Sequence, residues 1–198
     1  MNVTNRVIKR SFDLIVSLIG LIILFPAIIV AWIIAAIETR SNGFFIQKRV
    51  GRNGNLFNVY KIKTMKKVEG VETTITQAND VRITKNGEFF RRTKIDELPQ
   101  LWNVLIGKMS FVGPRPDVSG YADKLEGDDR IILTLRPGIT GPASMKYKDE
   151  EELLSRQVDP KEYNDKVIWP DKVKINIEYI SSWSFAKDIE YIIKTVAG

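Results

Sequence analysis

LIVSLIGLIILFPAIIVAWIIAAI, Leu14–Ile37, is a run of 24 residues without a charged side chain. As a straight helix rising about 1.5 Å per residue it would be about 36 Å long, enough to cross a hydrocarbon core of roughly 30 Å. A helix buried in a soluble domain would carry a polar stripe, and this run has none. A cleaved signal peptide would have an apolar stretch of only about 7–15 residues. The run therefore predicts a segment that inserts into a membrane.

Two features bear on how this run inserts. Pro26 lies near its middle, where a proline removes a backbone donor and clashes with the preceding turn, so we expect a kink. Both ends carry basic flanks, which prefer the cytoplasmic side: Arg6, Lys9, Arg10, Arg40, Lys48, Arg49 and Arg52. A hairpin bent at Pro26 keeps both flanks on one face, but its freed carbonyls need partners within hydrocarbon. On these grounds the re-entrant hairpin and the single span are equally good predictions.

The composition of the 198 residues restricts the chemistry. The chain has no histidine and no cysteine. Disulfides, a Ser-His-Asp triad, a cysteine nucleophile and a His/Cys zinc site are therefore excluded. Catalysis would have to use carboxylates, Lys, Arg, Tyr, Ser or Thr, or a hard metal held by oxygen ligands. The length is that of one domain, with room for an appendage such as the apolar segment.

Residues 41–67 carry seven basic and no acidic side chains. Beside a membrane segment, such a stretch favours contact with anionic lipid head groups. Nucleic acid is the competing explanation for the net charge of +6, but no nucleic-acid motif accompanies these residues, so we expect no nucleic-acid partner. Two β-prone runs, Phe44–Val50 and Leu56–Ile62, flank a Gly51–Gly54 turn and predict a hairpin, with a polar loop over 66–80.

A dense segment, IDELPQLWNVLIGKMSFVGPRPD, begins at Ile95 and holds two adjacent carboxylates. Apolar residues at helical spacing predict a helix from near Asp96 to Gly107. The helix dipole would favour the negative charges of Asp96 and Glu97 in its first turn. Taken alone, this ordinary first-turn acidity explains the pair better than a catalytic role does.

Basic residues surround the pair in the sequence. Arg91, Arg92 and Lys94 precede it, Arg115 follows in the stiff turn GPRP, and Arg136 lies in a second stiff turn, LRPGITGP. Arginine binds the oxygens of phosphate through paired hydrogen bonds. Together these residues predict a site for a phosphorylated substrate, where a carboxylate can attack phosphorus and Mg²⁺ can neutralise the oxygens.

The C-terminal part predicts further helices. An acidic helix start lies at Asp149–Glu152, and helical spacing of apolar residues from Asp171 onward is broken at Ser181–Ser184. These helices either pack on the domain or lie along the membrane surface.

The chain resembles the bacterial sugar transferase family, and within it the small monotopic phosphoglycosyl transferases. The matching motifs are KRSFD at Lys9–Asp13, the proline-interrupted run, FFIQKRVGRNGNLFNVYKIKTM, D-x-R-x-T-x-x-G at Asp80–Gly87, IDELPQLWNVLIGKMSFVGPRP, and RPGITG at Arg136–Gly141. The resemblance covers nearly all of the chain up to Gly141 and is weaker beyond it.

The resemblance implies an enzyme that moves a sugar-1-phosphate from a UDP-sugar to undecaprenyl phosphate and releases UMP, in the first membrane step of glycan assembly. It implies a ping-pong mechanism in which Asp96 is the nucleophile and forms a covalent phosphosugar intermediate. Glu97 would complete the dyad and assist the polyprenyl phosphate, with Mg²⁺ beside Asp96. By position, the residues that contact phosphate or substrate are Arg91, Arg115, Lys61 and Arg136.

The resemblance also implies an architecture. Residues 1–40 would form a re-entrant membrane helix, kinked at Pro26, with its basic flank. Residues 41–198 would form a cytoplasmic, helix-rich α/β catalytic domain with a small β-hairpin or sheet and interfacial C-terminal helices. The protein would then be monotopic on the inner face of the bacterial cytoplasmic membrane, and a homodimer is compatible with this arrangement.

Two departures from the family pattern matter. Phe25 precedes Pro26 where the family often has serine, and Pro142–Met145 stands where many relatives have Trp-Ala-Gln. The sugar and the pathway are therefore not carried over, and glucose, galactose and amino sugars are all compatible. A non-catalytic membrane adaptor of the same fold is the alternative, but a degenerate homologue would be expected to lose the carboxylates or arginines. A basic peripheral membrane or nucleic-acid binder is the third hypothesis.

Overall fold

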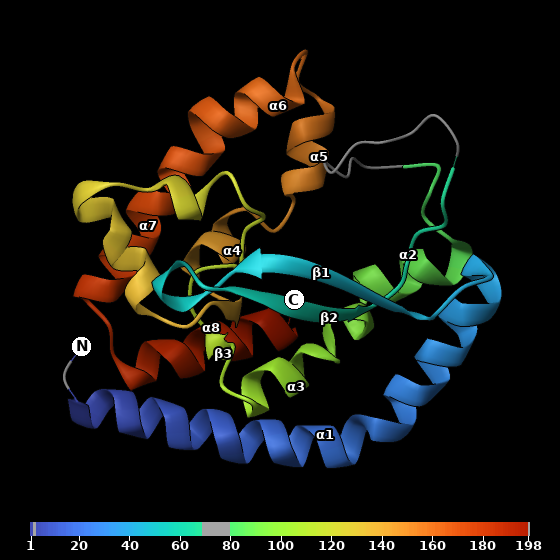
Figure 1. Ribbon diagram of the computed structural model, residues 1–198, viewed down its shortest axis with the longest axis horizontal. Coiled ribbons are helices and arrows are strands. Elements are labelled where there is room, and N and C mark those ends of the chain that lie inside the picture. Colours follow the sequence, from blue (N-terminus) through green and yellow to red (C-terminus); the bar gives the residue numbers. More distant parts are fainter. Residues whose placement is uncertain (2, 69–79, 198) are drawn as a thin grey trace.

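The computed structural model describes residues 1, 3–68 and 80–197 (Figure 1). Most of the polar loop predicted over 66–80 lies outside the described residues. The chain forms one long N-terminal helix, a β-hairpin, a small parallel sheet and a set of shorter helices. This helix-rich architecture with small sheets and one long apolar helix confirms the predicted fold class at that level.

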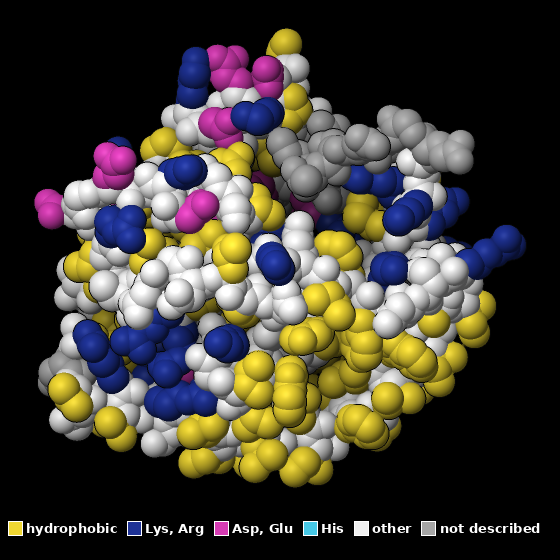
Figure 2. All heavy atoms as spheres, in the orientation of Figure 1, with side chains coloured by type: hydrophobic (Ala, Val, Ile, Leu, Met, Phe, Trp, Pro, Cys, Tyr) yellow, Lys and Arg dark blue, Asp and Glu magenta, His cyan; other side chains and the backbone are white. Residues whose placement is uncertain are grey.

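Helix α1 (Val3–Thr39) contains the whole apolar run, with Pro26 inside it. Among the described residues it is the one helix long and apolar enough to cross a membrane, and most of its apolar part is exposed. Figure 1 shows α1 running beneath the rest of the molecule and then turning upward beside the hairpin. Figure 2 shows a broad apolar surface over this helix. Such a surface favours contact with a membrane over contact with water.

Helix α1 packs on the rest of the chain near both of its ends. In its N-terminal part Lys9 forms an ion pair with Asp188 (2.5 Å), and Asp13 accepts a hydrogen bond from Ser110 (3.1 Å). Its C-terminal part shares an apolar cluster with β2 and α2, formed by Ile28, Ala31, Ala35, Ile62 and Phe90. Both ends of the helix are therefore attached to the same folded unit.

The predicted hairpin is confirmed with its bounds. Strands β1 (Phe44–Val50) and β2 (Leu56–Ile62) pair antiparallel, from Phe44 opposite Ile62 to Val50 opposite Leu56. The 3₁₀ turn η1 (Arg52–Gly54) joins them. Asn53 and Gly54 have positive φ values of 60° and 78°, a conformation that Asn and Gly tolerate better than other residues.

The helix predicted from Asp96 to Gly107 begins later than expected. Residues Ile95–Glu97 form the 3₁₀ turn η2, and the α-helix α3 spans Gln100–Leu105. The backbone makes hydrogen bonds between residues three apart up to the bond from Trp102 to Pro99 (3.1 Å). Pro99 has no N–H to donate, which favours this tighter winding before the α-helix starts.

A small sheet that the sequence did not predict joins the two stiff turns. Strand β3 (Ser110–Val112) pairs in parallel with β4 (Gly138–Thr140). A Cβ on Gly138 would lie 2.2 Å from the backbone nitrogen of Gly113. Only glycine allows this approach, so the GPRP and RPGITG motifs join through their backbones.

The remaining elements are helices and helical turns. They are α2 (Lys85–Arg92), η3 (Ala122–Lys124), η4 (Gly127–Thr134), α4 (Pro142–Lys146), α5 (Glu150–Ser155), α6 (Pro160–Tyr163), η5 (Asn164–Ile168), α7 (Trp169–Ser181) and α8 (Phe185–Ala197). Helix α7 buries Val173, Tyr179 and Ile180 in the main core. Helix α8 buries Asp188 but leaves Val196 84% exposed. Of the two predicted arrangements, packing on the domain holds for both helices, since Tyr191 and Ile192 of α8 also pack against this core, although α8 keeps an exposed apolar edge.

Candidate active site

The two adjacent carboxylates of the sequence lie in η2, between α2 and α3. Asp96 is 7% exposed, and its Oδ1 is buried without a hydrogen-bond partner among the described residues. A buried polar atom without a partner costs about 1–3 kcal/mol. Such an atom marks a place where an ion, a water molecule or a substrate group can bind. Asp96 therefore presents one free carboxylate oxygen.

The neighbouring Glu97 is held by two cations. Its Oε1 accepts hydrogen bonds from Lys61 Nζ (2.7 Å) and Arg115 Nη2 (3.0 Å). Burial by itself would raise the pKa of Glu97, but the charges of Arg115 and Lys61 outweigh burial and hold this pKa well below its usual range. Glu97 is therefore ionised at neutral pH and keeps both cations in place.

Asp96 is shifted in the opposite direction. Burial raises the pKa of Asp96 to about 6, a shift that Lys61 opposes and Glu97 increases. Two titratable neighbours whose pKa values are pushed apart are typical of groups with different chemical tasks. At neutral pH Asp96 is mostly ionised, more basic than an ordinary aspartate and free at one oxygen. These properties suit a nucleophile.

The cations of the site come from three separate elements. Lys61 belongs to β2, Arg115 lies in the turn after β3, and Arg91 lies in the last turn of α2. Arg91 forms an ion pair with Glu151 of α5, and its charge lowers the pKa of Asp96. The structure thus gathers five of the predicted site residues: Asp96, Glu97, Lys61, Arg91 and Arg115.

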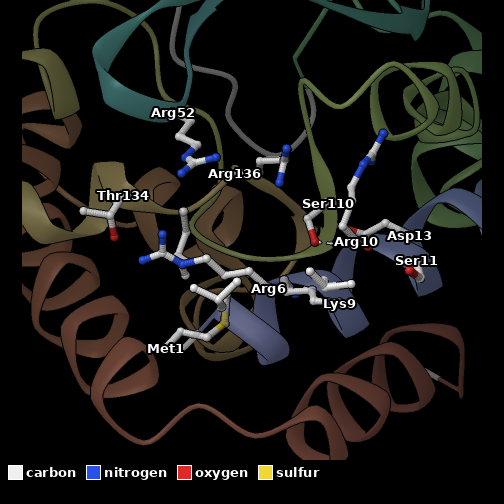
Figure 3. A pocket seen from close by; sticks show the side chains of 13 residues that line it. Met1, Arg6, Lys9, Arg10, Ser11, Asp13, Arg52, Ser110, Thr134 and Arg136 are labelled. Atoms are coloured by element: carbon white, nitrogen blue, oxygen red, sulfur yellow. Dashed lines mark hydrogen bonds between the residues drawn. The ribbon is translucent and has the colours of Figure 1, made fainter.

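Arg136 is not part of this group. Its Nε donates a hydrogen bond to the carbonyl of Gly107 (2.8 Å), just beyond the C-terminal end of α3. It lines a cavity together with Arg6, Arg10 and Arg52 (Figure 3), and none of the five gathered residues lines that cavity. The second stiff turn therefore carries its arginine to the opposite end of the η2–α3 segment from the carboxylate pair.

A third carboxylate, which the sequence analysis did not single out, extends the charge network. Burial raises the pKa of Asp117 to about 6, while the charges of Lys172, Arg49 and Arg115 lower it. Lys172 also forms an ion pair with Glu150 of α5 (2.6 Å). Asp117 follows the GPRP motif directly, which is the signal that could have found it. Lys172 and Glu150 are distant in sequence, and no spacing links them to the site.

The carboxylates of the site offer a magnesium ion few protein ligands. Among the described residues, no group of three or more Asp, Glu, His or Cys side chains could hold a metal ion. Mg²⁺ usually keeps several waters and binds through one or two carboxylates plus substrate phosphates. The free Oδ1 of Asp96 fits one such carboxylate ligand. The site therefore fits an ion completed by a substrate, and it does not fit a cage made of protein alone.

Known proteins are similar to this chain over nearly all of its length. The UDP-glucose:undecaprenyl-phosphate glucose-1-phosphate transferase of Escherichia coli (strain K12) is 35% identical over 97% of this chain and 40% of its own length. The undecaprenyl-phosphate galactose phosphotransferase of Salmonella typhimurium is 34% identical over 97% of this chain and 40% of its own length. The exopolysaccharide production protein ExoY of Sinorhizobium fredii is 28% identical over 95% of this chain and 83% of its own length.

The chain spans about two-fifths of the length of the Escherichia coli and Salmonella relatives. The family described as "Bacterial sugar transferase" matches residues 4–198. This match includes nearly all of α1, the hairpin, the carboxylate pair and the arginine-bearing turns. The chain therefore belongs to the bacterial sugar transferase family.

Proposed function

We propose that this chain transfers a sugar-1-phosphate from a UDP-sugar to undecaprenyl phosphate, releases UMP, and so begins the assembly of a glycan on a membrane lipid. The observation that carries the proposal is the buried Asp96, with one free oxygen and a pKa of about 6, beside a cluster of cations. The activities for which the Escherichia coli and Salmonella relatives are named support the same class of reaction.

In the first step, an ionised oxygen of Asp96 attacks the phosphorus that bears the sugar. The bond between this phosphorus and the bridging oxygen breaks, and UMP leaves with that oxygen and its electron pair. Asp96 then holds the sugar phosphate as a mixed anhydride. In the second step, a phosphate oxygen of undecaprenyl phosphate attacks the same phosphorus. The bond to Asp96 breaks, the carboxylate is restored, and the sugar is linked to the lipid through a diphosphate.

The residues around Asp96 stabilise the charge of the phosphates. The half-exposed guanidinium of Arg115 faces solvent on one side and Glu97 on the other, so it can reach a phosphate while it remains ion-paired. Lys61 is more enclosed and holds Glu97 from the hairpin. A magnesium ion held by Asp96 would supply further neutralisation of the diphosphate oxygens. Fixed cations that act where charge develops lower the barrier without reorganising.

We also propose that α1 is re-entrant, so that the protein is monotopic on the cytoplasmic face of the bacterial inner membrane. Support comes from the attachment of both parts of α1 to one folded unit, through Asp13 and Lys9 at one end and Ala31 and Ala35 at the other. A helix attached in this way cannot carry its ends to opposite sides of a bilayer unless those contacts break. The exposed apolar side chains between the ends would face the lipid.

The sugar donor is a separate question from the class of reaction. Relatives of nearly equal identity are named for glucose and for galactose. Residues Pro142–Met145, which depart from the family pattern, lie in α4, which packs on α7 and α8. The donor must therefore be identified by experiment.

The test of the reaction is UMP release by the full chain in nanodiscs. UDP-glucose, UDP-galactose and their N-acetylamino counterparts are each supplied with undecaprenyl phosphate, with Mg²⁺ or with a chelator. We expect one donor to be turned over, and without acceptor we expect the intact protein to gain the mass of one sugar phosphate. The absence of both turnover and adduct with every donor would favour the non-catalytic adaptor.

The topology is tested with single cysteines, since the chain has none of its own. Thr4→Cys and Ser41→Cys place reporters at exposed positions near the two ends of α1, on either side of the apolar run. A maleimide reagent that cannot cross membranes is applied to intact spheroplasts and to inverted vesicles. We expect both reporters to react only in inverted vesicles. Reaction of one reporter in spheroplasts and of the other in vesicles would establish a span.

A further inference from the structure

A cavity of about 300 Å³ lies between the N-terminal part of α1, the turn η1 and the segment that follows η4. Four arginines from these three places line it (Figure 3). Arg6 and Arg10 come from α1, Arg52 comes from η1, and Arg136 comes from the turn before β4. Residues distant in sequence thus bring four arginines to the walls of one cavity.

The positive charge of this cavity is largely unmatched. Among the residues that the structure describes, none of the four arginines forms an ion pair with a carboxylate. Asp13 lines the same cavity, but its Oδ1 already accepts hydrogen bonds from Ser110 Oγ and Phe111 N, each at 3.1 Å. Burial lowers the pKa of Arg136, the charges of Arg10 and Arg52 lower it further, and the charge of Asp13 opposes this shift without reversing it.

Helix capping explains two of the four arginines. Arg10 donates hydrogen bonds to the carbonyls of Val104 (2.7 Å) and Leu105 (2.8 Å), and Arg136 donates to Gly107. These carbonyls lie at the C-terminal end of α3 or just beyond it, and cations are favourable at that end of a helix.

Capping does not explain Arg52. Its Nε is buried and has no hydrogen-bond partner in the described structure. A buried, charged donor without a partner is costly, and it is completed by an anion with several acceptor oxygens. Phosphate has this chemistry, and guanidinium groups bind it through paired hydrogen bonds.

The walls of the cavity indicate where such a phosphate comes from. Val3 and Val7 of α1 line the cavity, yet they are 76% and 58% exposed. The apolar wall of the cavity therefore continues onto the exposed face of α1. In Figure 2 a cluster of basic side chains lies directly beside the apolar surface of this helix. A free phosphate needs no apolar wall, whereas an anionic lipid needs basic residues for its phosphate and an apolar surface for its acyl chains.

We propose that this cavity is a binding site for the phosphate of an anionic phospholipid, whose acyl chains extend along the exposed apolar face of α1. The phosphate contacts Arg52 and Arg6, the two arginines that do not cap α3. The site holds the N-terminal part of α1 at the membrane surface and gives the protein a preference for anionic bilayers. It is separate from Asp96 and does not depend on the proposed reaction.

The test is binding of water-soluble dihexanoylphosphatidylglycerol to the full chain in an uncharged detergent, measured by microscale thermophoresis. Dihexanoylphosphatidylcholine and inorganic phosphate form two further arms. We expect the anionic lipid to bind and both alternatives to bind much more weakly. In the double variant Arg6→Gln/Arg52→Gln we expect the affinity to fall about tenfold for each arginine removed, which corresponds to about 1.4 kcal/mol each.

The matched control is the double variant Lys48→Gln/Lys124→Gln, which removes the same charge at exposed positions outside the cavity. It should keep the wild-type affinity, as should Asp96→Asn, so that failure of this proposal is distinct from failure of the proposed reaction. Equal thermal unfolding temperatures show that the variants are folded.

Four results would overturn the proposal. The first two are unchanged affinity in the arginine variant and an equal loss in the lysine control. The third is inorganic phosphate binding as tightly as the lipid, which would make this a site for soluble anions. The fourth is displacement of the lipid by much lower concentrations of farnesyl phosphate, which would reassign the cavity to a polyprenyl acceptor.

Discussion

The two ends of the η2–α3 segment have opposite charge balances. At its N-terminal end Lys61 and Arg115 are ion-paired with Glu97, and the buried atom without a partner is a carboxylate oxygen, Asp96 Oδ1. At its C-terminal end guanidinium groups outnumber carboxylates, and the buried atom without a partner is a donor, Arg52 Nε. The unmatched atom indicates the ligand in each case. An acceptor oxygen suits a cation or an electrophilic phosphorus, whereas a charged donor suits an anion.

The largest expected effect tests whether the free oxygen at the N-terminal end is the nucleophile. We expect Asp96→Asn to lower turnover by about 10⁴-fold or more, as when a catalytic nucleophile is removed, and to abolish the phosphosugar adduct seen by intact-protein mass spectrometry. Asp117→Asn is the matched control, because it removes another carboxylate whose pKa is about 6. It should keep the adduct. An adduct on the Asp96 variant would show that Asp96 is not the nucleophile.

The next effect tests Glu97, the carboxylate of the same site that is paired with two cations. We expect Glu97→Gln to lower turnover by about 10³-fold, because Lys61 and Arg115 lose the carboxylate that positions them. Asp96 is ionised above its pKa of about 6, so activity is lost as the pH falls through that value. Because the charge of Glu97 raises this pKa, its removal should move the acid limb of the pH profile of kcat/KM to lower pH. If the acid limb stays at the same pH in this variant, it reports the titration of a group other than Asp96.

A smaller effect separates the two regions directly. We expect Arg115→Gln to lower turnover by about 10²-fold through lost compensation of phosphate charge, and to leave binding of dihexanoylphosphatidylglycerol unchanged. Lys48→Gln, which removes an exposed cation, controls for net charge and should alter neither measurement. Loss of lipid binding in the Arg115 variant would mean that the two regions are one site.

The smallest effect concerns stability. The pKa of Asp96 is about 6 in the folded protein, above its ordinary value of 3.8, so the folded state favours the protonated form. Ionisation of Asp96 therefore lowers the free energy of unfolding. This loss is absent below about pH 4 and reaches at most about 3 kcal/mol above pH 6. We therefore expect Asp96→Asn to unfold at a higher temperature than the wild type at pH 7.5, with a smaller difference at pH 5. A constant difference across this range would contradict the raised pKa.

Local patterns in the sequence predicted the elements whose interactions are local. The 24 uncharged residues lie within one helix, α1, and the two β-prone runs pair as β1 and β2 with the predicted bounds. Periodicity placed the helix of the carboxylate segment too early, because Ile95–Glu97 form a 3₁₀ turn and the α-helix begins only after Pro99. The pattern of side chains in such a short segment does not distinguish a 3₁₀ turn from the first turn of an α-helix.

The partners of those side chains could not be predicted in the same way. The motifs identified the family and five residues that the structure brings together, but they did not separate Arg136 from them. Parallel pairing of β3 with β4 brings the two arginine-bearing turns together through their backbones. Arg115 nevertheless points to Glu97, and Arg136 points to the end of α3. Side-chain direction at such a junction depends on packing.

The sequence by itself therefore determined the family, the long apolar segment, the hairpin and the position of the carboxylate pair, since each depends on patterns that can be read along the chain. The tertiary structure alone decided which carboxylate is neutralised and which stays free, because Lys61 and Arg115 reach Glu97 from separate elements. It also decided that Arg6 and Arg52 share a cavity. Burial and charge act over distances in space, and the folded chain sets those distances.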